Sequence, residues 1–362
     1  MKRNCIFWNV QRFFNRQGRS VAKSLGGVGK GWTKEVYERK LLNVAEVLKR
    51  GLPDGPPAFI ALAEVESIEV LTDLRDALGW HELRASDELF PDSTIDGLDV
   101  GILMDRTVFD LNTLRARSIS LDHRFSTRDL LQLEVALIQG GQDVAIFLAH
   151  WPSRLISEGE TLRFAYSVNL RRRINNVLQF GKAELIDEEG TVLLPDAQTL
   201  TKRWLTPCVV MGDFNDEPFD LSVRSALGST RFRDFTMRRG NLVGKSLTDI
   251  DNYLDEAFTL YNPCWALRFS DNEEVGGTFY RTEWRSYDQV MFSHGALLED
   301  APARYIEGSA RVLRLPEFNT NDKVVEMATS MAGAPRKFGS SDLTGVSDHF
   351  PLLFEMEFPT GR

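Results

Sequence analysis

The chain has 362 residues, of which 43% are hydrophobic and 26% are charged, so its composition is that of a globular protein able to bury a large core. Its formal net charge of −9 argues against a general nucleic-acid coat protein, because affinity for the phosphate backbone depends on Lys and Arg. The same charge is compatible with an enzyme that gathers carboxylates around a metal ion and engages phosphate through that ion.

The three cysteines, Cys5, Cys208 and Cys264, are widely spaced and form no CxxC or Cys/His pattern. This spacing argues against a disulfide framework and against a zinc site. The apolar run near the start is short and interrupted at Asn9, and no run approaches the length of a membrane span. We therefore expect a cytoplasmic protein without a membrane span.

Hydrophobic periodicity predicts strands and helices that alternate irregularly along the chain. In chain order, the predicted elements are a strand over 4–10, a helix over 34–50, a strand over 58–63, a helix over 67–78, strands over 98–104, 130–138 and 143–150, a helix over 159–186, and strands over 208–215, 278–284, 287–293 and 351–358. Because the strands come both as adjacent pairs and separated by helices, we predict an α/β protein with mixed sheets.

Three motifs place reactive side chains where predicted strands begin or end. GDFNDEPFD at 212–220 puts Asp213 and Asn215 two residues apart, so both face one side of an extended chain and offer oxygen to a hard cation or a water. AHWPSR ends a strand with His150, and Arg154 behind it is a candidate contact for an anionic substrate. SDHFPL at 347–352 places Asp348 and His349 side by side at the entrance of the last strand. Alone, GDFNDEPFD is equally typical of a polar turn, and each of the other two motifs is more often structural.

Three further polar residues lie at strand ends: Asn9 and Glu64 each close an apolar run, and Asp288 opens one. The position of Asp288 suits the orientation of a histidine. Since active sites of layered α/β folds gather at strand ends, the six positions together predict one convergent cleft. Asn9 and Asp348 must then meet in that cleft, so we expect residues 1–362 to form a single domain.

The ordered motifs resemble the endonuclease/exonuclease/phosphatase family, which includes DNase I-like nucleases and Mg²⁺-dependent phosphodiesterases. The matching stretches are NVQRFF, LAEVES, LDVGILM, STRDLLQLEV, AHWPSR, VVMGDFNDEPFD, GTFYRTEWRSYDQVMFS and GVSDHFPL. Jointly these motifs are specific, although none of them is specific alone. The resemblance implies a DNase I-like four-layer α/β-sandwich, in which two packed mixed β-sheets are flanked by helices.

The resemblance also implies roles for individual residues. Glu64 is expected to be the principal ligand of Mg²⁺ (or Mn²⁺), helped by Asn9 and Asp348. Asp213 is expected to orient or deprotonate the attacking water, and Asn215 to hold the phosphate or that water. At position 11 this chain has Gln where some nucleases of the family have an acid, so metal binding there rests on fewer charges.

For the remaining site residues, the resemblance implies that His349 donates to a phosphate oxygen and pairs with Asp288, and that His150 assists from the other side. Asp99 is the candidate acidic partner of His150. Arg128 resembles a residue that contacts the substrate phosphate in DNase-like relatives.

The sequence leaves several substrate classes open. A nuclease or nucleotide phosphodiesterase is favoured by Arg128 and by the basic, Gly-rich loop 15–33, whereas the stretch 227–275 is an elaboration expected to influence substrate choice. An inositol or other small phosphomonoester substrate is second, because GDFNDEP lacks the tyrosine and arginine of inositol-phosphatase relatives. A sphingomyelinase, which acts on a lipid phosphoester, is third, because no secretion signal is expected. A catalytically silent binding protein would lack an expected acid or histidine, and none is absent. The sequence indicates no protein partner.

Overall fold

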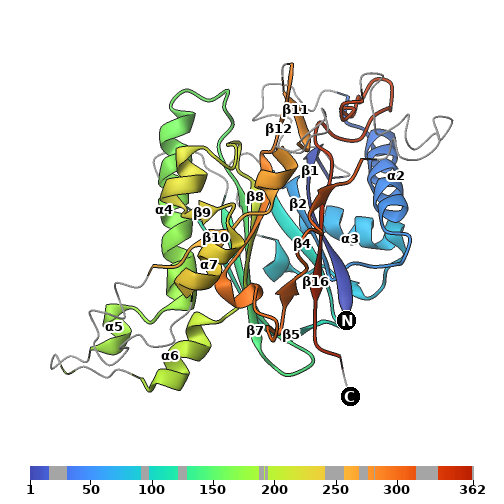
Figure 1. Ribbon diagram of the computed structural model, residues 1–362. Coiled ribbons are helices and arrows are strands. Elements are labelled where there is room, and N and C mark those ends of the chain that lie inside the picture. Colours follow the sequence, from blue (N-terminus) through green and yellow to red (C-terminus); the bar gives the residue numbers. More distant parts are fainter. Residues whose placement is uncertain are drawn as a thin grey trace.

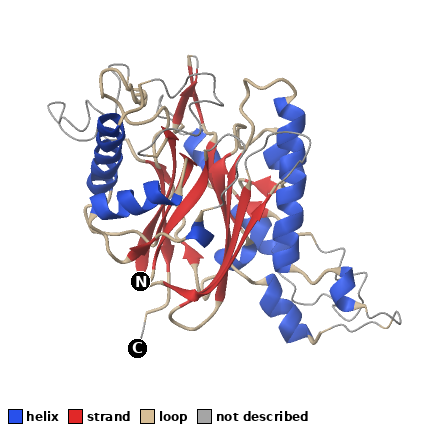
Figure 2. Ribbon diagram, turned by 180° about the vertical axis from the view of Figure 1, so that it is seen from behind, coloured by secondary structure: helices blue, strands red, loops and turns tan. Residues whose placement is uncertain are grey.

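The computed structural model describes residues 1–15, 31–90, 98–120, 129–186, 191, 195–240, 257–268, 276–280, 282–314 and 333–360. Two β-sheets pack face to face, and helices cover the outer face of each sheet (Figure 1). Figure 2 shows the same layers from behind. The predicted four-layer α/β-sandwich with two mixed sheets is confirmed. Most of the predicted basic loop 15–33 and much of the elaboration 227–275 lie outside the described residues.

One sheet, called here the β1 sheet, has the strand order β14-β16-β1-β2-β4-β3, with β15 paired to β16. Its strands are β1 (Lys2–Phe13), β2 (Phe59–Val65), β3 (Leu83–Arg84), β4 (Asp99–Asp105), β14 (Arg304–Tyr305), β15 (Arg311–Val312) and β16 (Leu352–Glu357). Strand β1 pairs parallel to β2 and antiparallel to β16, with Cys5 opposite Phe354. The first and last strands of the chain therefore lie side by side.

The other sheet, called here the β8 sheet, has the order β5-β6-β7-β8-β13-β10-β9. Its strands are β5 (Phe109–Ile119), β6 (Leu130–Leu137), β7 (Asp143–His150), β8 (Cys208–Asp213), β9 (Ser229–Thr230), β10 (Leu260–Tyr261) and β13 (Asp288–Phe292). Strands β7 and β8 are parallel, and His150 lies opposite Asp213. A Cβ atom at Gly212 would lie 2.1 Å from the backbone oxygen of Ala149, so this pairing requires glycine directly before Asp213.

The main core lies between the two sheets and contains side chains from both, including Phe7, Leu133, Val209 and Phe354. The intervening residues of β1 point to the opposite face, as the period of two in a strand requires. Trp8, for example, packs into a second core beneath the helices that cover the β1 sheet. These apolar layers fix the strands whose polar ends form the site.

Most helices cover the outer faces of the sheets, whereas the helix that begins at Cys264 places this residue in the core between them. The helices are α2 (Lys34–Gly51), α3 (Ile68–Leu78), α4 (Gly159–Leu178), α5 (Lys182–Leu185), α6 (Ala197–Trp204), α7 (Arg233–Gly240) and α9 (Cys264–Arg268). Helices α2 and α3 cover the β1 sheet, and α4 lies on the β8 sheet (Figure 1). Thr33 Oγ1 accepts a hydrogen bond from Val36 N and so caps the start of α2. Within the described part of the chain, no helix is long and apolar enough to cross a bilayer.

Two predictions of secondary structure need correction, and some elements were missed. The expected single strand 278–284 is a hairpin of β11 (Thr278–Tyr280) and β12 (Glu283–Arg285). The expected helix 159–186 stops at Leu178, because Gln179 has an extended conformation, and α5 follows separately. Strand β5 and helix α6 were not predicted.

Candidate active site

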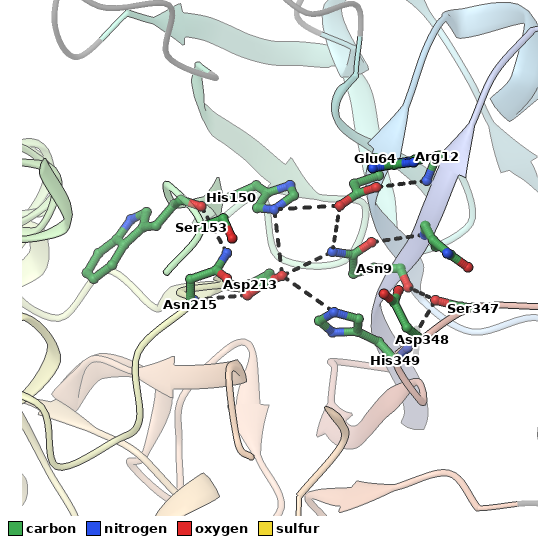
Figure 3. A network of polar contacts seen from close by, with 12 residues as sticks. Asn9, Arg12, Glu64, His150, Ser153, Asp213, Asn215, Ser347, Asp348 and His349 are labelled. Atoms are coloured by element: carbon green, nitrogen blue, oxygen red, sulfur yellow. Dashed lines mark hydrogen bonds and ion pairs between the residues drawn. The ribbon is translucent and has the colours of Figure 1, made fainter. Parts of the chain in front are cut away.

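Polar side chains from both sheets converge at one edge of the sandwich (Figure 3). Asn9, the last residue of β1 before its pairing with β2 becomes irregular, joins the two sheets: its Nδ2 donates to Asp213 Oδ2 at 3.0 Å and to Glu64 Oε1 at 3.3 Å. His150 Nε2 lies 3.6 Å from Asp213 Oδ2 and 4.0 Å from Glu64 Oε1. Asn9, Glu64, His150 and Asp213 therefore form one cluster of polar contacts, called here the center of the site.

On the β1 sheet, the chain reaches this center through left-handed backbone conformations. Glu64 has φ +65° at an irregularity in the pairing of β2, and Gln11 and Arg12 have φ +51° and +49°. Gln11 N donates to Asn9 Oδ1 at 3.0 Å, and Arg12 N donates to Glu64 Oε2 at 2.8 Å. Such conformations are strained for residues other than glycine and gather at functional sites. Here they fix the direction of one amide and one carboxylate.

The segment before β16 joins the same center. Ser347 Oγ donates to the backbone oxygen of Asn9 at 2.6 Å and accepts from His349 N at 3.1 Å, which places Asp348 beside β1 (Figure 3). Lys337 Nζ lies 3.3 Å from Asp348 Oδ2. Burial raises the pKa of Asp348, but the positive charges of His349 and Lys337 outweigh burial and hold this pKa below its ordinary value.

On the β8 sheet, Asp213 is buried. Its Oδ1 accepts from Asn215 N at 2.9 Å, and Asn215 adopts φ +49° while its Nδ2 donates to Trp151 O at 3.0 Å. Burial and the charge of Asp288 raise the pKa of Asp213 to about 6, although His349 and the bonds from Asn9 and Asn215 lower it. Asp213 thus becomes a stronger base than an exposed aspartate.

His349 connects the last strand to the β8 sheet. Its Nδ1 lies 2.6 Å from Asp288 Oδ2 and 2.9 Å from Thr278 Oγ1, and Thr278 Oγ1 donates to Asp288 Oδ2 at 3.0 Å. Burial lowers the pKa of His349, but Asp288, Asp213 and Asp348 outweigh burial and raise it to about 10. The imidazole is therefore protonated at neutral pH. Its Nε2 faces the center, 3.9 Å from Asp213 Oδ2.

The three remaining predicted site residues, Arg154, Asp99 and Arg128, have different places in the structure. Arg154 Nε donates to Asn215 O at 2.8 Å, and its Nη2 binds Asp216 and Asp220. The guanidinium therefore stabilises the loop after β8. Asp99 is buried at the start of β4, and its pairing with His150 stays a prediction. Arg128 lies outside the described residues.

Sequence reasoning missed several residues that hold the site. Thr278 and Ser347 stand inside motifs that were recognised, but nothing marked their hydroxyl groups as contacts of His349. Trp8 Nε1 donates to His349 O at 2.8 Å, and an indole within an apolar run gives no signal of this bond. Buried Lys40 on α2 was also missed, although a lysine between apolar helix positions is a detectable signal.

The donor set suits a hard divalent cation. Glu64 and Asp348 offer carboxylate oxygens, the ligands that Mg²⁺ and Mn²⁺ prefer. Asn9 Oδ1 accepts one hydrogen bond from Gln11 N and keeps a second lone pair for a cation. A second group, Asp213, Asp288 and His349, brings candidate ligand atoms within 4.8 Å of one another. Asp288 Oδ1 is buried without a hydrogen-bond partner among the described residues. The arrangement can therefore combine cation binding with proton transfer.

Comparisons with known proteins agree with this arrangement. A family model described as "Endonuclease/Exonuclease/phosphatase family" matches residues 6–186 and 197–358. No curated protein matches the chain.

Three solved structures are similar in fold. The human Nocturnin catalytic domain with bound sulfate is 16% identical, with 99% of this chain and 94% of that chain covered and a TM-score of 0.50. TDP2 from D. rerio complexed with single strand DNA product is 13% identical, with 98% and 99% covered and a TM-score of 0.50. Mannosyl-6-phosphatase from Bacteroides thetaiotaomicron is 13% identical, with 98% and 99% covered and a TM-score of 0.51. At these identities the likeness shows the fold alone.

Proposed function

Because the chain belongs to the endonuclease/exonuclease/phosphatase family, we propose that it is a divalent-metal-dependent phosphoester hydrolase acting on nucleic acid or nucleotide phosphodiesters. The family and its solved neighbours support a phosphoester hydrolase as the broad activity. One observation carries the finer proposal: oxygen ligands of the β1 sheet and acid–base groups of the β8 sheet meet through Asn9, which bonds to both Glu64 and Asp213.

In this proposal, Glu64, Asn9 and Asp348 hold Mg²⁺ or Mn²⁺. When bound, the cation neutralises phosphate charge and polarises the phosphoryl group toward attack. Arg12 N keeps one oxygen of Glu64 fixed, and Gln11 N fixes the amide of Asn9. These contacts favour a preorganised ligand set, in which little conformational freedom is lost on binding.

Asp213 is proposed to orient and deprotonate the attacking water. A general base is most effective when its pKa lies near the working pH, and the raised pKa of Asp213 meets this condition. Asn215 is held by Trp151 O and projects beside Asp213, where it positions the water or a phosphate oxygen.

Protonated His349 is proposed to donate from Nε2 to a non-bridging phosphate oxygen, where negative charge builds in the transition state. Asp288 keeps Nδ1 occupied, so the Nε2–H stays directed at the center. His150 is proposed to assist the reacting group from the side of Glu64, with Asp99 as its proposed partner.

A pocket beside the site supports a substrate with a planar group next to the scissile phosphate. It has a volume of about 320 Å³ and is lined by Arg154, Tyr280, Thr282, Glu283, Arg285 and Tyr287. The rings of Tyr280 and Tyr287 lie 6.3 Å apart, and the guanidinium of Arg154 lies 5.2 Å from the center of the Tyr287 ring. Aromatic rings and arginines suit stacking with a nucleobase. The proposed phosphate contacts, Arg128 and Arg154, also favour a nucleic-acid or nucleotide substrate. The basic residues of 15–33 favour the same substrate class.

A second candidate function is phosphomonoester hydrolysis, favoured by the likeness to a mannosyl-6-phosphatase. Inositol and lipid phosphates belong to this alternative. A silent binding protein is disfavoured because every expected acid and histidine is present. We further propose that residues 1–362 form one domain and act in the cytoplasm, where free thiols such as the buried Cys5 and Cys208 are maintained.

A substrate panel tests the proposal. Single-stranded DNA, RNA, nucleotide diesters, inositol and sugar phosphates, and chromogenic mono- and diesters are each incubated with Mg²⁺, Mn²⁺ or EDTA. We expect diester hydrolysis with either cation and none in EDTA. Full activity in EDTA contradicts metal dependence, and hydrolysis of monoesters alone favours the second candidate.

A further inference from the structure

Lys40 of α2 is a fully buried lysine that the proposed mechanism does not use. An ammonium removed from water costs free energy unless polar or aromatic partners replace the lost hydration. Lys40 Nζ donates to Gln11 O at 3.1 Å and also donates to Val346 O. It lies 4.9 Å from the center of the Phe338 ring, within the range of a cation–π contact. These partners account for its burial.

The two carbonyl groups bound by Lys40 belong to the two segments that present the proposed metal ligands. Gln11 starts the left-handed turn after Asn9, and the next residue, Arg12, binds Glu64 through its backbone N–H. Val346 stands two residues before Asp348. One ammonium group therefore joins the end of β1 to the entrance of β16.

Neighbouring contacts reinforce this connection. Asn43, three residues after Lys40 on α2, donates from Nδ2 to Gly345 O at 3.0 Å. Phe338 N donates to Gln11 Oε1 at 3.0 Å, so the ring that covers Lys40 is tied to the same turn. Burial lowers the pKa of Lys40 to about 7, while the charges of Asp348 and Glu64 raise it. The charged form of Lys40 is thus coupled electrostatically to two of the proposed ligands.

We propose that Lys40 is a positioning residue that sets the spacing of Asn9, Glu64 and Asp348 before the cation binds. The inference rests on the proposed function, because it concerns the ligands of the proposed metal site. Lys40 acts through Gln11 and Val346 and does not itself touch the substrate. Loss of its hydrogen bonds leaves the two segments joined only by weaker connections such as the bond from Ser347 Oγ to Asn9 O, so the main consequence is weaker cation binding rather than a lost chemical step.

A graded series of variants separates this role from ordinary packing of α2. Lys40→Met removes both carbonyl contacts, whereas Lys40→Gln keeps an amide donor on a slightly shorter side chain. Asn43→Leu removes a contact to the Asp348 segment alone. Tyr37→Phe is the matched control, because it removes a bond of the same helix, from Tyr37 Oη to Asp73 Oδ2 at 2.7 Å, on the side facing α3.

The measurement is Mn²⁺ binding by the full chain, followed by electron paramagnetic resonance of the free ion, with a thermal melt of each variant. Outer contacts of a metal site typically contribute about 10- to 100-fold in affinity. We expect Lys40→Met to raise the Kd for Mn²⁺ by about tenfold or more. Lys40→Gln and Asn43→Leu are expected to fall between Lys40→Met and wild type, and Tyr37→Phe to match wild type even where its melting temperature drops.

Each outcome decides a different question. Wild-type affinity in folded Lys40→Met overturns the positioning role but leaves the proposed metal site intact. An equal loss in Tyr37→Phe also overturns it, because the effect then follows general stability. Should Lys40→Met not fold, unchanged affinity in both Lys40→Gln and Asn43→Leu overturns the inference. Absence of Mn²⁺ binding by wild type overturns the metal site and this inference together.

Discussion

The two sheets place their polar residues in the shared center by different means. On the β1 sheet, Asn9 and Glu64 are held by backbone N–H groups of a left-handed turn, and Asp348 keeps 28% of its side chain exposed. On the β8 sheet, Asp213 and Asp288 are buried, and burial raises the pKa of Asp213.

This difference indicates that the two sets of residues have different functions, cation binding and proton transfer. A partly exposed carboxylate whose pKa is held low, as in Asp348, suits a cation, which must enter from water. A buried aspartate with a raised pKa suits proton transfer near neutral pH. Substitutions of Asn9, Glu64 and Asp348 should therefore change the metal requirement. Substitutions of Asp213 and Asp288 on the β8 sheet, and of His349, which faces them from the entrance of β16, should change turnover at saturating metal.

The largest effect is expected for Asp213→Asn. An amide cannot take a proton from water, so kcat for a chromogenic diester should fall by about two to four orders of magnitude at saturating Mg²⁺. A thermal melt checks that the fold is retained. A near-normal kcat in the folded variant would show that the general base lies elsewhere.

His349→Ala should follow closely, because it removes the proposed donor to the phosphoryl oxygen; we expect a decrease in kcat of about 10²–10³. Asp288→Asn keeps the imidazole but removes the charge that raises its pKa, so its kcat should lie between those of His349→Ala and wild type. Steady-state kinetics of both variants provide the comparison. The reverse order would contradict a positioning role for Asp288.

Glu64→Gln should affect the metal requirement. Replacing the carboxylate by a neutral amide should raise the half-saturating Mg²⁺ concentration by about tenfold or more. The measurement is turnover of the diester over a Mg²⁺ titration. An unchanged half-saturating concentration would place the cation in the other group, with Asp213, Asp288 and His349.

The pH profile of wild type is the mildest test. Asp213 must be deprotonated, so kcat/KM should rise through about pH 6, and His349 must be protonated, so it should fall above about pH 10. Each limb should approach a tenfold change per pH unit. A profile without an acid limb would contradict Asp213 as the base.

The sequence predicted the strand ends well because an apolar run that stops at a polar residue is a local pattern. The fold class, and the positions of Asn9, Glu64, His150 and Asp213 at strand ends, follow from such runs. Strand β5 escaped prediction because many of its residues, including Arg115 and Arg117, are polar and partly exposed, so its apolar signal is weak. Lys40 and Thr278 escaped because their partners lie far away in the chain, and only the fold brings them together.

The division between the sheets is tested most directly by measuring Mn²⁺ affinity and turnover together in Glu64→Gln and Asp213→Asn. Glu64→Gln should bind Mn²⁺ weakly and recover part of its turnover at high Mn²⁺. Asp213→Asn should bind Mn²⁺ nearly as wild type does and stay slow at every concentration. Weak binding by Asp213→Asn, together with wild-type binding by Glu64→Gln, would contradict this division.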